Sequence, residues 1–157
     1  MAEQYSFISH WQIRAPLPKV WDAIYDSQYW PIWWDGVVTV KIIKPGDVNG
    51  VGGVREYTWK GILPYSLNFK MRLNEIDKYK RMQGIASGEL EGVGEWIFEE
   101  KDGITSIQYY WNVKTTLKWM NKVAFIMKPL FKFSHNLVMK WGAKGLAKKL
   151  DAPLLAY

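Results

Sequence analysis

Few side chains in this sequence have the types and spacing that metal, phosphate or covalent chemistry requires. The 157 residues include no cysteine and two histidines, His10 and His135, which are too few for a typical zinc site. The glycine-rich stretch 50–53 lacks the strand-to-helix context and the following Lys and Ser or Thr of a phosphate-binding loop. The glutamates within 89–100 fall mostly on the outward faces of predicted strands, so they give no inward carboxylate pair for glycosidase chemistry. We therefore expect no metal and no cofactor.

Four residues remain as candidates for proton transfer or for hydrogen bonds to a ligand. His135 lies near the edge of the apolar face of a C-terminal helix, four residues after Phe131, where it could exchange a proton near neutral pH or act as a hydrogen-bonded structural residue. Arg55, Tyr57 and Tyr109 fall on the inward faces of strands. An inward arginine requires an acidic partner or an anionic ligand group, unless it lies at the strand end and reaches water. The tyrosine hydroxyls suit a ligand carbonyl or hydroxyl, buried backbone or water.

Aromatic side chains are unusually abundant. They make up 16% of the sequence, with 10 Trp, 9 Tyr and 6 Phe. Rings in such numbers suit either a well-packed core or the walls of a cavity, because they offer a large contact area at a small cost in entropy. Composition alone leaves both interpretations open.

The hydrophobic periodicity predicts the elements that would position these residues. Residues 5–13 alternate as a half-buried strand, and prolines then open two short helices over 16–36. Residues 37–113 alternate between turns, which predicts about six more strands. The region 117–150 has a helical period, and Pro129 is expected to divide it into a short and a long helix or to kink it. The sequence thus predicts one α+β domain over residues 1–157, with a curved antiparallel seven-stranded sheet wrapped around a long C-terminal helix.

This architecture predicts an internal cavity. Consecutive antiparallel strands twist and curl, and one helix is too thin to fill the hollow of a strongly curved sheet. Glycine and alanine on two neighbouring strands, at 84–88 and 92–94, remove side-chain volume from the middle of the sheet, although the glycines also suit bulges and bends. The residues expected to line the cavity are Arg55, Tyr57, Trp59, Phe69, Met71, Met82, Gly84, Ala86, Trp96, Tyr109, Trp111, Met127, Phe131 and His135.

The net charge of +6 is concentrated in the C-terminal helical region. Such a helix can bind nucleic acid or an anionic membrane surface, or it can simply present a solvated face. We expect no nucleic-acid partner and allow a transient contact with a membrane surface; the oligomeric state is left undefined. The lysines of this region, which only Asp151 opposes, are Lys118, Lys122, Lys128, Lys132, Lys140, Lys144, Lys148 and Lys149.

The sequence also indicates a cytoplasmic location. No apolar run approaches the roughly 18 to 20 residues that cross a bilayer. Residues 1–8 lack the basic start of a signal peptide, and the absence of cysteine is compatible with a reducing compartment.

Four stretches of sequence resemble those of the helix-grip superfamily. The pattern W-x-I-x-A-P-x-x-x-V-W-D-A-I at 11–24 is similar to its first strand and helix. The aromatic stretch at 29–37 and the segments 86–96 and 135–150 resemble its bacterial polyketide cyclase/dehydrase-like branch. The superfamily also includes START lipid-transfer domains and birch-pollen-allergen-like proteins. The resemblance implies the fold and a ligand-holding cavity, but no reaction, since members include lipid carriers, hormone receptors and aromatase/cyclases.

Three functional hypotheses follow from these observations. The first is binding or transport of a hydrophobic small molecule, which could be a lipid, an isoprenoid, an aromatic or a polyketide-like compound. The second is a polyketide cyclase/dehydrase-like enzyme that acts on a cavity-bound substrate, although the sequence offers no obvious acid–base pair. The third is a basic module for membrane surfaces.

Overall fold

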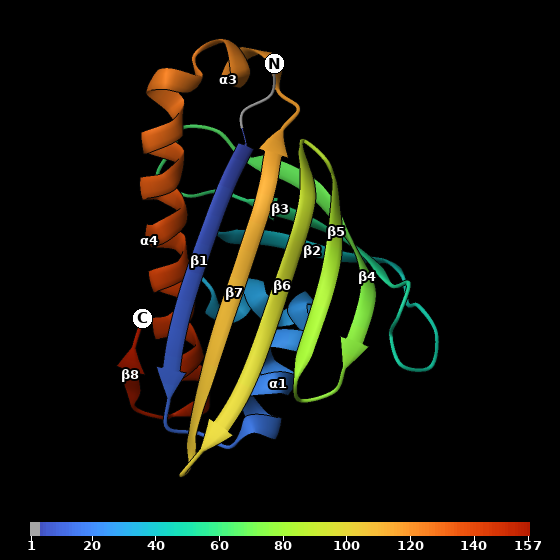
Figure 1. Cartoon of the computed structure of the whole chain (residues 1–157), viewed down its shortest axis with the longest axis vertical. Helices are drawn as coiled ribbons and strands as arrows, with labels where there is room; N and C mark the ends of the chain where they lie inside the picture. The colour runs from blue at the N-terminus through green and yellow to red at the C-terminus, as the bar shows by residue number, and fades with distance from the viewer. Residues whose placement is uncertain (1–3) are drawn as a thin grey trace.

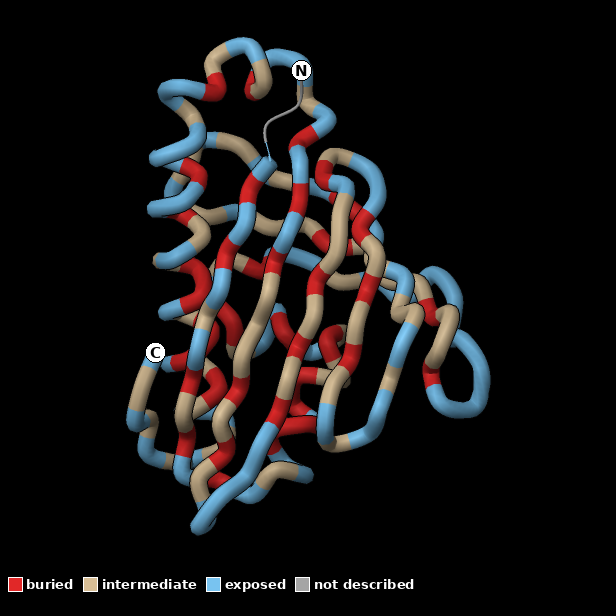
Figure 2. The backbone as a smooth tube through the Cα atoms, in the orientation of Figure 1, coloured by how far each residue is buried: buried red, intermediate tan, exposed pale blue. Residues whose placement is uncertain are grey.

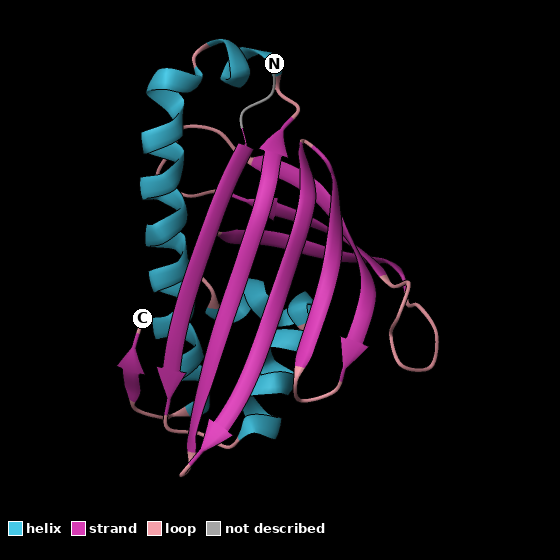
Figure 3. Cartoon of the chain, viewed as in Figure 1, coloured by secondary structure: helices cyan, strands magenta, loops and turns pink. Residues whose placement is uncertain are grey.

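An antiparallel sheet curves beside one long helix in the computed structural model, which describes residues 4–157 (Figure 1). The sheet has eight strands in the order β2-β3-β4-β5-β6-β7-β1-β8. Figure 3 shows the short helices behind the sheet and the long helix along its β1 side. In chain order the elements are β1 (Gln4–Ile13), α1 (Leu17–Tyr25), the 3-10 turn η1 (Ser27–Tyr29), α2 (Trp30–Trp33), β2 (Val37–Lys44), β3 (Val54–Trp59), β4 (Leu67–Asp77), β5 (Arg81–Gly88), β6 (Leu90–Lys101), β7 (Ile104–Thr115), α3 (Lys118–Lys122), α4 (Ala124–Leu150) and β8 (Leu154–Ala156).

The predicted α+β architecture is confirmed, with one strand more than the seven expected. The additional strand β8 follows Pro153 and pairs with β1 through Ala156 opposite Gln12 and Leu154 opposite Ile13. A strand of three residues is too short to show a period of two, so its sequence carried no signal. None of the helices within residues 4–157 is long and apolar enough to cross a membrane.

The alternating pattern of the central strands places their apolar residues on the inner face. In β5, Met82, Gly84 and Ala86 are buried, and in β6 Trp96 and Phe98 are buried. Figure 2 shows the alternation of buried and less buried residues along these strands. The period of two therefore predicted the inner face of these strands correctly.

The helix α4 continues through Pro129. The prediction that this proline divides the helical region into a short and a long helix is therefore wrong about the position of the division. The break in the helical region falls earlier, at Val123 between α3 and α4. A proline at 129 removes the hydrogen bond to the carbonyl of Phe125, in the first turn of the helix. Because Phe125 is 80% exposed, solvent can replace that bond at a small cost, and the helix continues.

The second half of α4 packs tightly on α2. A Cβ atom added at Gly142 would overlap the ring of Trp34, and one added at Gly145 would overlap the carbonyl oxygen of Trp33. The indole Nε1 of Trp34 also donates a hydrogen bond of 2.8 Å to the carbonyl of Val138. These contacts fix the helix against α2 and Trp34, and the main cavity lies beside the turns of α4 that precede Gly142.

Candidate functional site

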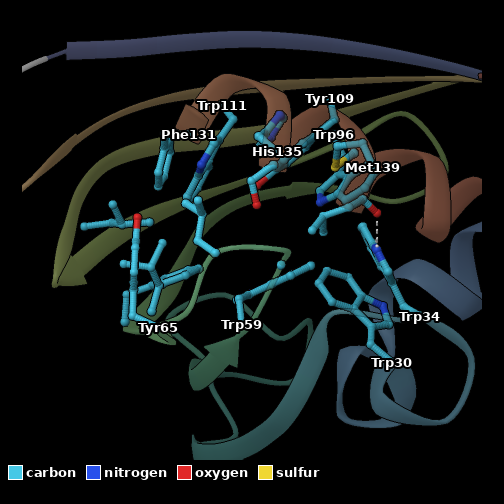
Figure 4. Close-up of a pocket in the computed structure, with 17 residues that line it drawn as sticks. Trp30, Trp34, Trp59, Tyr65, Trp96, Tyr109, Trp111, Phe131, His135 and Met139 are labelled. Atoms are coloured by element: carbon cyan, nitrogen blue, oxygen red, sulfur yellow. Dashed lines mark hydrogen bonds between the residues drawn. The ribbon is translucent and has the colours of Figure 1, made fainter. Parts of the chain in front are cut away.

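The main cavity lies between the inner face of the sheet and the first half of α4 (Figure 4). Its volume is about 100 Å³. Figure 4 shows Trp59 and Tyr65 on one side of it and Trp111, Phe131 and His135 on the opposite side. The residues that line it are Trp30, Trp34, Trp59, Gly61, Leu63, Tyr65, Leu67, Phe69, Leu90, Trp96, Tyr109, Trp111, Phe131, Ser134, His135, Val138 and Met139.

A second cavity of about 60 Å³ lies next to the first, beneath α1 and η1. Its walls come from the end of α1 and from β3, β4, β5 and β6. The residues that line it are Ile24, Tyr25, Ser27, Trp30, Arg55, Tyr57, Trp59, Phe69, Met71, Leu73, Met82, Gly84, Gly94, Trp96 and Tyr109.

Five aromatic side chains, Trp30, Trp59, Phe69, Trp96 and Tyr109, line both cavities and separate them. We call this set the aromatic partition. Trp96 and Tyr109 are register partners on β6 and β7, and their rings stack at 4.1 Å. Trp30 packs edge-on against Trp59 at 6.1 Å and against Trp96 at 6.2 Å. The two spaces therefore share a wall to which these five rings contribute.

The structure brings together most of the residues that were predicted to line a cavity. Arg55, Tyr57, Met71, Met82 and Gly84 line the second cavity alone. Ala86 and Met127 line neither cavity. Ala86 is buried between its register partners Met71 and Gly92, and Met127 packs against the core as a half-buried side chain. The predicted residues that line the main cavity are Trp59, Phe69, Trp96, Tyr109, Trp111, Phe131 and His135.

The small residues of the sheet accommodate neighbouring side chains, which makes the cavity smaller than the sequence suggested. A Cβ atom at Gly94 would lie 2.8 Å from the hydroxyl of Tyr109 and 2.9 Å from the ring of Trp111. One at Gly84 would lie 2.7 Å from the Cε of Met71. These glycines therefore let bulky side chains lie flat on the sheet, and the remaining space lies above those side chains.

Sequence reasoning missed the cavity residues that come from loops and from the α1–α2 region. Trp30 and Trp34 were recognised as part of an aromatic stretch but were not assigned to the cavity. The loop predicted at 61–64 has no periodic pattern, so nothing in its sequence indicated that it forms a wall. Tyr65 begins the alternating run that continues through Leu67 and Phe69, but it was not assigned to the cavity, and in the structure β4 begins only at Leu67. Ser134 and Val138 share the helix face of Phe131, so the helical period could have assigned them to the cavity as well.

Three polar atoms in the walls of the main cavity are buried without a hydrogen-bond partner among residues 4–157. They are the Nε1 of Trp59, the hydroxyl of Tyr65 and the Nδ1 of His135. By contrast, the indole nitrogens of Trp30 and Trp34 donate to the carbonyls of Ala23 and Val138. Buried polar atoms are nearly always paired, so three unpaired ones around one cavity are available to a ligand. Unpaired buried atoms also occur elsewhere, on Gln28, Trp33 and Asn74.

The ionisable groups of the cavity are neutral at pH 7. Burial lowers the pKa of His135 from 6.5 to about 4, and its ring stacks on Phe7 at 4.1 Å. Burial, together with the nearby Tyr5, raises the pKa of Tyr65 to about 12, and burial also raises the pKa of Tyr109. These groups can therefore offer neutral hydrogen bonds to a ligand.

Arg55 binds uncharged partners directly, and its charge also acts on the nearby carboxyl of Asp26, where it opposes the rise in pKa that burial causes. Its Nη1 donates hydrogen bonds to the carbonyl of Tyr25 and, at 2.6 Å, to the Oγ of Ser27. The Oγ of Ser27 and the hydroxyl of Tyr57 share a further hydrogen bond of 2.8 Å. Within the described chain Arg55 forms no ion pair, whereas Arg81 pairs with Glu75 and Glu95. Arg55 thus connects β3 to the end of α1 and to η1.

The described residues contain no cluster of three or more His, Asp or Glu side chains that could hold a metal ion.

Three solved structures share this fold over most of the chain. The Zhui aromatase/cyclase from Streptomyces sp. R1128 has a TM-score of 0.78 at 11% identity, with 95% of this chain and 94% of its own covered. The protein TTHA0849 from Thermus thermophilus has a TM-score of 0.75 at 11% identity, with 92% and 99% covered. A START superfamily protein from Mycobacterium smegmatis has a TM-score of 0.71 at 12% identity, with 94% and 97% covered.

The chain therefore has the helix-grip fold, as its motifs predicted. No family model matches the sequence, and no curated protein matches it. At identities of 11–12% the structural similarity shows the fold alone. Any activity has to be argued from the cavity itself.

Proposed function

We propose, from the helix-grip fold that this chain shares with an aromatase/cyclase and a START superfamily protein, that it binds a hydrophobic small molecule in the main cavity. The ligand class is an apolar, ring-containing molecule that carries at least one keto or hydroxyl group. Lipid, isoprenoid, aromatic and polyketide-like compounds include molecules of this description.

One observation carries the proposal: an aromatic cavity with three unpaired polar atoms on separate parts of its wall. Trp59 lies on β3, Tyr65 on the loop before β4, and His135 on α4. An indole N–H can only donate, whereas a phenol or a neutral imidazole can donate or accept. A ligand with a carbonyl or hydroxyl group would supply the missing partners, and the rings would bury its apolar surface at about 25 cal/mol per Å².

The volume of the main cavity limits the ligand that fits without rearrangement. Sites for drug-sized ligands commonly have volumes of about 300–1,000 Å³, whereas an apolar cavity of about 150 Å³ holds a benzene ring. A cavity of about 100 Å³ is smaller than the one that holds benzene, so even a ligand with a single ring would require some side chains of the wall to move. A longer ligand would have to displace side chains of the aromatic partition and extend into the second cavity.

Binding fits the site better than acid–base catalysis does. A general acid or base works best when its pKa lies near the working pH. The pKa values of about 4 for His135 and about 12 for Tyr65 lie far from neutrality on either side. These groups suit recognition of a polar substituent, and we do not assign a catalytic residue.

The test is ligand capture by the wild-type protein and by a variant with a filled cavity. Native mass spectrometry of protein purified from its own host should reveal a bound small molecule, whose affinity is then measured by titration. Leu67→Trp adds bulk to the wall of the main cavity and should lower that affinity at least about tenfold, because the ring occupies the ligand's space.

Lys70→Trp is the matched control, since Lys70 lies on the same strand but is exposed. Both variants should give the far-ultraviolet circular dichroism spectrum of the wild type. Retention of full affinity by Leu67→Trp, or equal loss in both variants, would contradict binding in the main cavity.

A further inference from the structure

The first half of α4 exposes apolar side chains on the face that points away from the cavity. Phe125 is 80% exposed and Phe133 is 59% exposed, although both are large hydrophobic residues. With 100° per residue, they share an arc of about 140° with Ile126 and Leu130, whereas the cavity residue Phe131 lies on the buried face. Trp119 on the preceding α3 is also half exposed. We call Trp119, Phe125, Ile126, Leu130 and Phe133 the end patch.

The stretch of sequence that carries the end patch has only positive charges. Between Gly103 and Leu150 the sequence contains no aspartate or glutamate. Further along α4 the same exposed face changes from apolar to basic, with Lys140, Lys144 and Lys148. Figure 1 shows α3 and the start of α4 together at one end of the molecule, where they can meet a large surface. The exposed lysines nearest in sequence to the end patch are Lys118, Lys122, Lys128 and Lys132.

We propose that the end patch docks this protein onto an anionic lipid bilayer. Exposed phenylalanine, isoleucine, leucine and tryptophan beside lysines are the composition of segments that lie in a membrane interface. The apolar side chains would enter the boundary of the acyl chains, and each lysine near an anionic surface would contribute about 1 kcal/mol.

Other occupants fit the end patch less well. In a symmetric dimer the patch would face itself, so the lysines of the two copies would repel one another. Nucleic acid would satisfy the lysines but would bury the phenylalanine rings against phosphates, which offer them no apolar contact. An anionic bilayer offers negative headgroups and apolar chains at the same surface.

The position of the end patch connects docking to the cavity, and this step rests on the proposed function. Trp119 packs edge-on against Tyr65 at a ring distance of 5.1 Å, and Tyr65 lines the main cavity. Phe131 and His135 line the cavity from the inner face of the same helical turns whose outer face carries Phe133. Docking would therefore place one wall of the cavity at the bilayer, from which a hydrophobic ligand could enter.

The test is vesicle flotation of the full chain. Wild-type protein should float with vesicles of phosphatidylcholine and phosphatidylserine, and much less with phosphatidylcholine alone. The double variant Phe125→Ser/Phe133→Ser should bind the anionic vesicles at least about tenfold more weakly, because it loses most of the exposed aromatic surface. Its control is Ile8→Ser/Val48→Ser, which removes two comparably exposed apolar side chains elsewhere.

A second pair of variants tests the charge. Lys122→Gln/Lys132→Gln should weaken binding to anionic vesicles about thirtyfold, since two lysines contribute about 1 kcal/mol each. Lys41→Gln/Lys70→Gln, which neutralises two exposed lysines of β2 and β4, should leave binding unchanged.

Several results would overturn the proposal. Failure of the wild type to float, or equal flotation with neutral and anionic vesicles, would do so. Self-association in solution that Phe125→Ser/Phe133→Ser abolishes, or binding of an acidic protein without any vesicle binding, would assign the end patch to another partner. The Leu67→Trp variant keeps the two proposals separate, because it should lose the ligand and still float.

Discussion

The two cavities differ in what their polar atoms do. In the second cavity the polar groups satisfy one another: Arg55 donates to Ser27 and to the carbonyl of Tyr25, and Ser27 pairs with Tyr57. In the main cavity the hydroxyl of Tyr65 and the Nδ1 of His135 have no partner within residues 4–157, nor has the indole nitrogen of Trp59, which lies in the partition that both cavities share. An unsatisfied buried polar group costs about 1–3 kcal/mol. The contrast supports a structural role for the second cavity and a ligand-binding role for the main one.

The walls of the two cavities also differ in how much of each belongs to regular secondary structure. The second cavity is bounded by α1, η1 and adjacent paired strands, which the Arg55 hydrogen bonds hold together. Part of the wall of the main cavity is the loop 61–66 and the first half of α4, whose outer face carries the exposed end patch. The loop 61–66 belongs to no strand or helix, so this part of the wall opens at a lower cost than a paired sheet does. A ligand would therefore enter the main cavity through this wall.

The largest effect is expected from breaking the polar network of the second cavity. Arg55→Met removes the donor to Ser27 and to the carbonyl of Tyr25, and should lower the free energy of unfolding by about 3 kcal/mol. Urea denaturation measures this loss. Arg72→Met, an exposed arginine on β4, should change stability by less than about 0.5 kcal/mol. Equal stability of the two variants would show that the second cavity does not depend on its network.

A smaller effect is expected from the titration of His135 in the main cavity. Its pKa is about 4 in the folded protein and 6.5 without burial, so below pH 6.5 the unfolded state binds the proton more readily. Stability should therefore fall as the pH decreases from about 6.5 towards about 4. Between about pH 7.5 and about pH 5 the wild type should lose about 2 kcal/mol that His135→Gln does not lose.

Urea denaturation at the two pH values gives this difference. His10→Gln, which removes an exposed histidine of β1, serves as the control and should keep the pH dependence of the wild type. A pH dependence that His135→Gln shares with the wild type would mean that this imidazole is hydrated, and the contrast between the cavities would then be weaker.

The sequence predicted the parts of the site that belong to regular elements. The period of two in β6 and β7 placed Trp96, Tyr109 and Trp111 on the inner face, and each lines the main cavity. The helical period placed Phe131 and His135 on the face of α4 that meets the sheet. Regular elements repeat, so a side chain's direction follows from its position along them.

The remaining features depend on contacts between distant parts of the chain. Arg55 binds the backbone carbonyl of Tyr25, thirty positions earlier in the chain. Every residue has such a carbonyl, so the sequence could not indicate which one Arg55 would bind. Tyr65 shares the alternating pattern of the strand that follows it, but its unpaired hydroxyl is a property of the packed structure alone. The size of the cavity could not be predicted from the sequence either, because the space above Gly94 is filled by the ring of Trp111.

The smallest effect, and the sharpest comparison, comes from removing one hydroxyl in each cavity. Tyr65→Phe deletes an unpaired hydroxyl and keeps the ring that packs on Trp119, so the free energy of unfolding should stay the same or rise by up to about 1 kcal/mol. Tyr57→Phe deletes the partner of Ser27 and should lower it by about 1 kcal/mol. Titration with the captured ligand should show the reverse order, with affinity reduced several-fold in Tyr65→Phe and little changed in Tyr57→Phe. A variant at 65 that loses stability while keeping full affinity would assign its hydroxyl to the fold, and the main cavity would then differ from the second only in size.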